Sequence, residues 1–176
     1  MFVLDTSAVI NLLGTAAAPR LLRGLATPCL VEERVISELK YHPIPGKNLI
    51  AELEQLQAAA LLTRARMSDA AYEVFVGLAA VSGVGGLGIG ESAAIAIAQD
   101  MSGVVVLDDR KARRKAQAAF PTLRIASSTQ VFLDGAAGAK MPDAELYDLF
   151  RAAQASACMG VLRDDKPLIA HLKLFD

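Results

Sequence analysis

The stretch Phe2-Val3-Leu4-Asp5-Thr6-Ser7 is the starting point from which the rest of this chain can be interpreted. Three apolar residues of the kind found in buried strands lead directly into an aspartate, and two hydroxyl residues follow it. In open α/β sheets, ligands bind at the carboxyl ends of the strands. An ionised side chain at that edge needs a neutralising partner, and a bound cation is the simplest one. The stretch therefore predicts a core strand with a functional carboxylate at its tip.

Strand-like and helical apolar patterns alternate along the chain. Short strands are predicted at residues 2–4, 61–66, 104–107 and 123–126. Helices are predicted at residues 7–13, 17–25, 31–39, 49–60, 69–80, 91–98, 110–120 and 144–158, with a further short helix capped by residues 127–129. This alternation predicts an α/β fold, a three-layer α/β/α sandwich with a mostly parallel central sheet.

Length and composition narrow the classes of protein to consider. A chain of 176 residues is expected to form one domain with a substantial core, and its many alanines favour tightly packed helices. No apolar run reaches the roughly 20 residues that cross a bilayer, and no basic leader precedes the first strand, so we expect a cytoplasmic protein without a membrane partner. The net charge of −1 excludes a global basic field for nucleic acid, so any such contact must be local.

Cysteine and histidine are too sparse to suggest a soft metal site. Cys29 and Cys158 have no neighbouring cysteine or histidine at ligand spacing, and both are expected to be buried, reduced and structural. His42 and His171 are too far apart in the sequence for a histidine site. Any metal site is therefore expected to be built from oxygen.

Acidic residues do occur in a suggestive series. Each follows a predicted strand or lies near a helix end in an apolar neighbourhood, and they are Asp5, Glu38, Glu91 and the pair Asp108 and Asp109. Clustered carboxylates repel one another unless a cation neutralises them, and Mg²⁺ or Mn²⁺ suits a site made only of oxygen. Such a metal supports phosphodiester hydrolysis, because it orients a phosphate, acidifies water and stabilises the leaving oxygen.

These acids lie in four motifs that, taken in order, resemble those of PIN-domain proteins. The motifs are Asp5-Thr6-Ser7, Val35-Ile36-Ser37-Glu38-Leu39, Gly90-Glu91-Ser92-Ala93-Ala94-Ile95-Ala96-Ile97-Ala98 and Val106-Leu107-Asp108-Asp109-Arg110-Lys111-Ala112-Arg113. The resemblance runs from residue 2 to about residue 158, so we expect a PIN-like nuclease domain at 1–158 and an unassigned C-terminal tail at 159–176. It implies a divalent-metal ribonuclease and often the toxin of a toxin–antitoxin pair, as in VapC-like proteins.

The resemblance also implies roles for individual residues. Asp5, Glu38, Glu91 and Asp109 would be the catalytic, metal-binding quartet, with Asp108 as a close alternative or fifth metal ligand. Thr6 or Ser7 would support the ligands with a hydroxyl group. Two departures from the family pattern stand out: Glu91 occupies a position that is often aspartate, and Leu107 stands where a threonine commonly precedes the last acid. The second departure leaves the choice between Asp108 and Asp109 open.

Each motif also has a purely structural interpretation. Asp5, Glu91 and the pair Asp108 and Asp109 could cap helices, and Glu38 alone would be read as a solvated helix residue. The glycine-rich loop at 82–90 fits G-x-G-x-x-G, but it follows a predicted helix rather than a strand, so nucleotide binding is disfavoured.

Positive charge is concentrated directly after the last acids. Arg110, Arg113 and Arg114 would hold RNA phosphates beside the metal site. An ordinary solvated face, with Asp109 and Arg113 as an i,i+4 pair, explains them equally well.

The sequence thus predicts a metal-dependent endoribonuclease that uses Mg²⁺ or Mn²⁺. RNA is the expected substrate, an antitoxin protein a possible partner, and a homodimer the expected assembly. Two alternatives remain open: a PIN-like module that binds nucleic acid or protein without turnover, and a metal-dependent phosphohydrolase that acts on a small phosphate ester.

Overall fold

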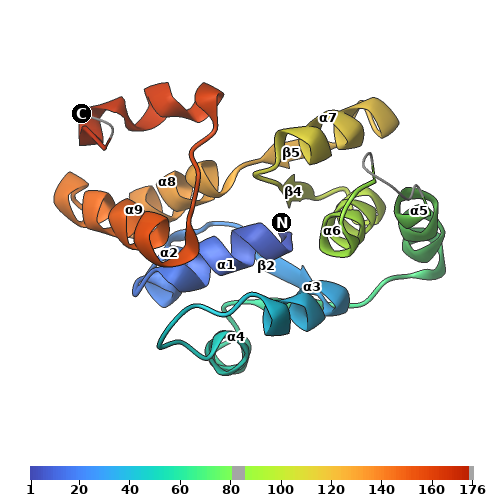
Figure 1. Cartoon of the computed structure of the whole chain (residues 1–176), viewed down its shortest axis with the longest axis horizontal. Coiled ribbons are helices and arrows are strands. Elements are labelled where there is room, and N and C mark those ends of the chain that lie inside the picture. The colour runs from blue at the N-terminus through green and yellow to red at the C-terminus, as the bar shows by residue number, and fades with distance from the viewer. Residues whose placement is uncertain (81–85, 175–176) are drawn as a thin grey trace.

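The computed structural model describes residues 1–80 and 86–174, and the first part of the predicted glycine-rich loop lies outside these ranges. A five-stranded sheet has the order β3-β2-β1-β4-β5, and all its strand pairs are parallel (Figure 1). The strands are β1 (Phe2–Leu4), β2 (Cys29–Glu32), β3 (Thr63–Ala65), β4 (Val104–Val106) and β5 (Arg124–Ala126). The predicted α/β class is confirmed.

Helices flank this sheet, and their bounds follow the predicted ones closely. The α-helices are α1 (Thr6–Gly14), α2 (Ala18–Gly24), α3 (Glu33–Glu38), α4 (Leu49–Ala58), α5 (Asp69–Ala79), α6 (Ile89–Asp100), α7 (Arg110–Ala119), α8 (Ser128–Gly138) and α9 (Asp143–Ala157). Two 3-10 helices are η1 (Leu39–Tyr41) and η2 (Arg163–Leu172). Within the described ranges, every helix is too short or too polar to span a lipid bilayer.

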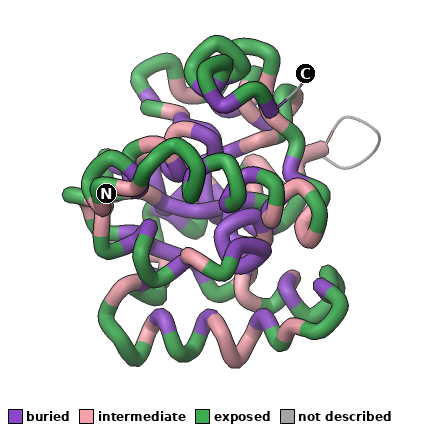
Figure 2. The backbone as a smooth tube through the Cα atoms, turned by 90° about the vertical axis from the view of Figure 1, so that its left-hand side faces the viewer, coloured by how far each residue is buried: buried purple, intermediate pink, exposed green. Residues whose placement is uncertain are grey.

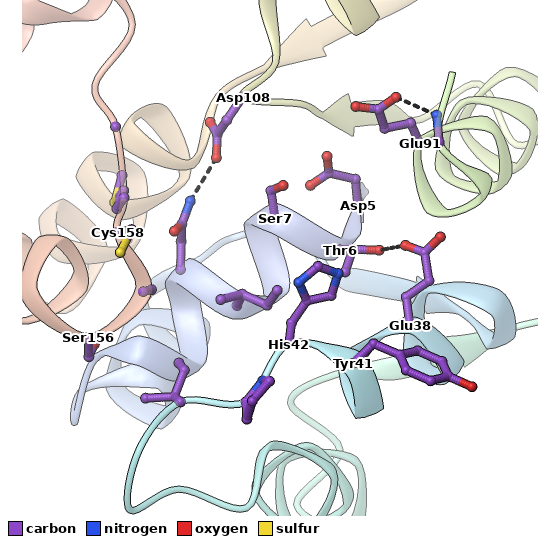
Figure 3. A pocket seen from close by; sticks show the side chains of 18 residues that line it. Asp5, Thr6, Ser7, Glu38, Tyr41, His42, Glu91, Asp108, Ser156 and Cys158 are labelled. Carbon is purple, nitrogen blue, oxygen red and sulfur yellow. Dashed lines mark hydrogen bonds between the residues drawn. The ribbon is translucent and has the colours of Figure 1, made fainter. Parts of the chain in front are cut away.

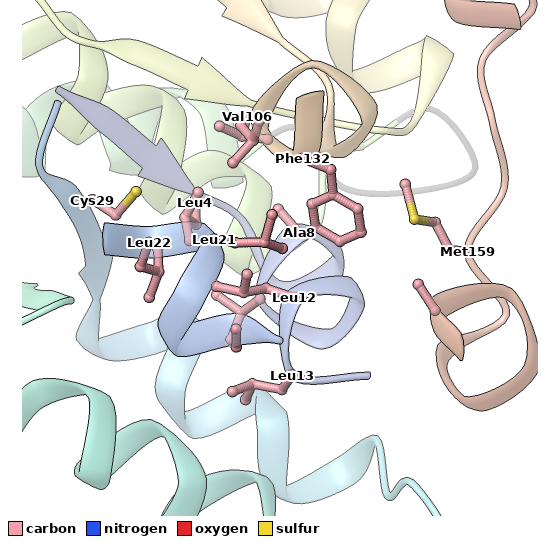
Figure 4. Packing of buried hydrophobic residues seen from close by; sticks show 14 of the residues in the cluster. Leu4, Ala8, Leu12, Leu13, Leu21, Leu22, Cys29, Val106, Phe132 and Met159 are labelled. Atoms are coloured by element: carbon pink, nitrogen blue, oxygen red, sulfur yellow. The ribbon is translucent and has the colours of Figure 1, made fainter. Parts of the chain in front are cut away.

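Alternate side chains of the central strands supply two separate cores. Leu4 of β1 belongs to the larger core, which is built with α1, α2, α4, α8 and α9 (Figure 4). Val3 points the other way and joins the smaller core formed with α5, α6 and α7. The chain trace is accordingly buried along its centre and exposed around it (Figure 2). This two-sided burial explains why the central strands β1 and β4 are uniformly apolar instead of alternating.

Strand β2 is the main error of the sequence-based assignment. Val31 and Val35 are four residues apart, which matches a helical period and led to a predicted helix at 31–39. In the structure Val31 is a fully buried strand residue paired with Leu4, and the helix begins only at Glu33. A strand buried on both faces lacks the period-two pattern that would have distinguished it.

The C-terminal segment packs against the domain. Residues 163–172 form η2, in which Ile169 and Leu172 are buried as members of the larger core. Met159, between α9 and η2, is buried in the same core. Cys158, expected to be buried, is exposed because it ends α9 in a left-handed conformation with φ of 55°, whereas Cys29 is buried as expected.

Candidate active site

A cavity of about 790 Å³ opens at the carboxyl edge of the sheet. Four acids from separate parts of the chain line it, and Figure 3 shows them around the first turn of α1: Asp5, Glu38, Glu91 and Asp108. Because every strand is parallel, the tips of β1 and β4 lie at the same edge, as the sequence predicted. The residues 156–160 that follow from α9 close the cavity on another side.

Asp5 is the most deeply placed of the four acids. Its side chain is 1% exposed, and its Oδ1 accepts the N–H of Ala8 at 2.7 Å, so it also caps α1. Burial raises the pKa of Asp5 well above its ordinary value, the Ala8 hydrogen bond opposes this, and the negative charges of Asp108, Glu91 and Glu38 raise it further. The structural and functional interpretations of Asp5 therefore do not exclude each other.

Glu38, at the end of α3, reaches the first turns of α1 and α6. Its Oε2 accepts the hydroxyl of Thr6 at 2.5 Å, and its Oε1 accepts the N–H of Gly90 at 2.9 Å (Figure 3). A Cβ atom at Gly90 would lie 2.5 Å from Glu38 Oε2 and 2.2 Å from Thr6 Oγ1, so any side chain there would displace these two hydrogen-bonded groups. The hydroxyl of Thr6 thus supports a carboxylate, while Ser7 lines the cavity.

Glu91 lies in the first turn of α6. Its Oε2 accepts the N–H of Gly88 at 2.8 Å, a contact that caps the helix (Figure 3). An acid is favoured at this helix terminus without any metal. Its position on the cavity wall nevertheless leaves it available to a ligand there.

Asp108 and Asp109 have different environments. Asp108 lines the cavity, where it accepts hydrogen bonds from the amide of Asn11 at 2.8 Å and from the N–H and hydroxyl of Ser128 at 2.8 and 2.5 Å. Burial raises the pKa of Asp108, although these hydrogen bonds and Arg113 lower it in part. Asp109 is outside the cavity wall, and its Oδ1 accepts the N–H of Ala112 to cap α7.

Two of these supporting residues were not identified from the sequence. Asn11 lies in the apolar helix α1 and is buried, which is an unusual position for an amide. The available clue in the sequence was an amide within an otherwise apolar run, residues 8–13. Ser128 directly follows the N-cap residue Ser127, so nothing in the sequence distinguishes it from a residue that only starts the helix.

The four acids do not converge on a single position where a metal ion could bind. Among the described residues, no three His, Cys, Asp or Glu side chains converge closely enough to hold an ion. Glu38, Glu91 and Asp108 each accept hydrogen bonds from protein donors. Binding of a cation would compete with these hydrogen bonds.

The donor chemistry nevertheless fits a hard divalent cation. The four acids supply only carboxylate oxygen, and among the described residues that line the cavity there is no lysine or arginine. Glu32 provides the contrast, because this acid at the tip of β2 is 2% exposed but pairs with Arg34 at 2.7 Å. Asp5 is as deeply buried and receives a backbone hydrogen bond without such an ion pair.

Basic residues of α7 lie beyond Asp108. Arg110, Arg113 and Arg114 line a second hollow of about 530 Å³. Arg113 does not pair with Asp109 as an i,i+4 partner; its Nη1 donates to the carbonyls of Leu107 and Ala126 at 2.9 and 2.8 Å. Arg113 therefore fixes α7 to the ends of β4 and β5.

Comparison with known proteins agrees with this geometry. A family model described as a PIN domain matches residues 1–124. The chain belongs to the PIN-domain family. The matched part contains all four acids of the cavity, while Ser128 and the 156–160 wall of this PIN domain lie beyond it. No curated protein and no solved structure matches the chain.

Proposed function

We propose that this PIN domain is a divalent-metal-dependent endoribonuclease that hydrolyses phosphodiester bonds of RNA. The observation that carries the proposal is a buried aspartate in a cavity lined by three further acids, with no lysine or arginine among its described lining residues. A cluster of this kind is costly in isolation and becomes favourable when a cation neutralises it. Membership of the PIN-domain family makes nucleic acid the expected substrate.

Each residue of the cavity would have a separate role in the reaction. Asp5, Glu38, Glu91 and Asp108 would hold Mg²⁺ or Mn²⁺, which supplies an acidified water and charge stabilisation at phosphorus. Thr6 orients Glu38, and Asn11 and Ser128 orient Asp108. Ser7 faces the same space and is proposed as a further hydroxyl support.

Asp108 is proposed as the fourth ligand in preference to Asp109. Asp108 faces Asp5 across the cavity, whereas the Asp109 carboxylate is used at the N-terminus of α7. We expect Asp108→Asn to abolish cleavage and Asp109→Asn to lower stability while it retains most cleavage. Equal loss of cleavage at equal folded concentration in both variants would instead make Asp109 a ligand.

The decisive experiment compares RNA cleavage in Mg²⁺, in Mn²⁺ and in EDTA. Wild-type protein, Asp5→Asn and Asp134→Asn are used at equal folded concentration, with Asp134 as the control because it is exposed on α8. We expect metal-dependent cleavage by the wild type and the control only. Mn²⁺ binding that Asp5→Asn removes, without cleavage of any RNA, would favour the silent binding module. Faster turnover of a small phosphodiester than of RNA would favour the alternative phosphohydrolase.

For the biological role we propose the toxin of a type II toxin–antitoxin pair, with an antitoxin peptide whose arginine reaches the acidic cavity. Induced expression is expected to stop bacterial growth, and Asp5→Asn is expected to relieve the arrest. We also propose a homodimer. The alanines of α6 are fully buried inside one chain, so a dimer interface must use other surfaces. Growth unaffected by the active enzyme would remove the toxin role and leave the ribonuclease intact.

A further inference from the structure

The acidic cavity and the basic hollow are bordered by the same two segments of chain. Asp108 and residues 156–160 line the acidic cavity. Residues of α7 that follow Asp108, together with residues 162–164, line the hollow beside it. Both spaces are therefore lined by neighbouring stretches of the same two segments, which are residues 108–114 on one side and residues 156–164 on the other.

Positive charge collects in the second space. Its lining consists of Leu162 and Asp164 together with four arginines, which are Arg110, Arg113, Arg114 and Arg163. Arg110, Arg114 and Arg163 are exposed, and none of them forms an ion pair with an acid in the described part of the chain. The four guanidinium groups outnumber the single carboxylate of Asp164, so the hollow attracts an anion, and the planar donors of arginine match phosphate oxygens.

We propose that this basic hollow binds the phosphate backbone of RNA next to the bond that is cut, and that Arg163 of the C-terminal segment completes it. The proposal rests on the ribonuclease function proposed above. The described lining contains no aromatic side chain, so bases have no surface to stack on there. Contacts of this type position a strand without reading its sequence.

Arg163 is held in place before RNA arrives. It begins η2, and η2 is anchored by the buried side chains of Ile169 and Leu172, while Met159 anchors the chain just before it. On the opposite wall, Arg113 ties α7 to two strand ends. Both walls are thus anchored to the core, which lowers the entropy lost when a ligand is bound.

The test measures binding separately from cleavage. Fluorescence anisotropy of a labelled oligouridine is recorded in EDTA at several salt concentrations for the wild type, Arg163→Gln, Arg114→Gln and Arg151→Gln. Arg151 is a matched control, because it is exposed on α9 and lines neither space. Each lost phosphate contact is expected to weaken binding and to reduce the slope of log K against log salt by about 0.7. Arg151→Gln should match the wild type.

Two results would overturn the proposal. One is an Arg163→Gln protein that binds with the affinity and salt slope of Arg151→Gln. The other is wild-type binding of a polyglutamate chain that is tighter than binding of the RNA and equally dependent on Arg163, which would assign the hollow to an acidic protein.

The experiments distinguish a failure of the proposed nuclease activity from a failure of the proposed phosphate binding by the hollow. Oligouridine binding is measured in EDTA and cleavage is measured with Mn²⁺, so the two activities are recorded independently. Binding that depends on Arg163 in a protein that never cleaves RNA would support the hollow and reject the nuclease. Metal-dependent cleavage that is unchanged in Arg163→Gln and Arg114→Gln would support the nuclease and reject the hollow.

Discussion

At the scale of single residues, the buried carboxyl group of Asp5 is the feature that links fold and function. It caps α1 and at the same time faces three other acids. Glu32, equally buried one strand away, is neutralised by Arg34. A carboxylate without such a partner lowers the stability of the protein unless a proton or a metal binds it.

The raised pKa of Asp5 predicts how stability changes with pH. The folded protein holds this proton more tightly than the unfolded chain, so the free energy of unfolding falls as pH rises from the ordinary pKa of 3.8 through the raised folded value. The Asp5→Asn variant has no ionisable carboxyl group at this position, so its free energy of unfolding does not fall for this reason as pH rises. In EDTA we expect the variant to unfold at higher urea than the wild type at neutral pH, with a difference that shrinks toward about pH 4.

Addition of Mn²⁺ should reverse this order, because the metal stabilises only the protein that binds it. A variant less stable than the wild type at every pH in EDTA would show that the Ala8 hydrogen bond outweighs the burial of charge.

Asn11 is predicted to act on the site through Asp108. Asn11→Ala removes the 2.8 Å hydrogen bond that orients this carboxylate, and loss of a group that supports a metal ligand typically lowers metal affinity or activity about 10- to 100-fold. Asn48→Ala is the matched control, since it removes the N-cap of α4 and costs about 1 kcal/mol of stability without touching the cavity. Mn²⁺ titration by calorimetry and RNA cleavage provide the readouts. Equal defects in the two variants would trace the effect to stability alone.

The sequence identified the acids more readily than their supporting residues. Asp5, Glu38, Glu91 and the pair Asp108 and Asp109 follow local patterns of strand tips and helix ends, which a sequence displays directly, although the sequence favoured Asp109 over Asp108. Asn11 meets Asp108 across 97 residues, and no local pattern reports such a contact. The sequence also could not show which of Asp108 and Asp109 lines the cavity. That depends on which carboxylate caps α7 in the folded protein, and the structure shows that it is Asp109.

At the scale of elements, two helices meet through glycine. A Cβ atom on Gly138 of α8 would lie 1.8 Å from the carbonyl oxygen of Gly24 in α2, and a Cβ atom on Gly24 would lie 2.0 Å from the carbonyl oxygen of Gly135. Backbone cannot move aside as a flexible side chain can. The close approach of α2 and α8 therefore depends on the absence of side chains at these positions.

Alanine substitution of two glycines should have opposite effects. Gly138→Ala forces α2 and α8 apart and is expected to cost about 1–3 kcal/mol. Gly77→Ala, in the exposed part of α5 with nothing near the added Cβ, is expected to stabilise the protein by about 0.5–1 kcal/mol. Urea unfolding of both variants measures the difference. A neutral Gly138→Ala would mean that the helices adjust without loss of packing.

Element types were largely predictable from sequence, with β2 as the informative exception. Amphipathic helices such as α4 repeat their buried leucines at helical spacing, and the sequence shows this directly. In β2, side chains are buried on both faces, so the only periodic signal came from Val31 and its chance partner Val35 in the next helix. The length of the segment and the turn residues around it were signals too weak to correct the helix assigned there.

At the scale of the whole molecule, the C-terminal segment packs into the same core as one face of the sheet. Its buried residues join the core that contains Leu4 and Phe132. It also lies outside the part of the chain that matches the PIN-domain family. Periodicity did not reveal this packing, since η2 is a 3-10 helix interrupted by Pro167.

Ile169→Ala should therefore destabilise the entire domain. The side chain is fully buried, and its truncation is expected to cost about 2–5 kcal/mol in a single unfolding transition. Leu168→Ala, at a neighbouring residue that is 46% exposed, should change stability by less than about 1 kcal/mol. Circular dichroism during urea unfolding tests both. Separate early melting of the segment, with the main transition unchanged, would show that it folds independently.

The order of strands in the sheet also determines when the protein can fold. The central strand β1 pairs with β2 and β4, and Phe2 aligns with Val104. At a synthesis rate of about 5–20 residues per second, β1 therefore waits roughly 5–20 s on the ribosome before β4 exists. During that interval, one edge of the apolar strand β1 has no partner. The nascent chain is consequently most exposed to aggregation and to chaperones before β4 has been made.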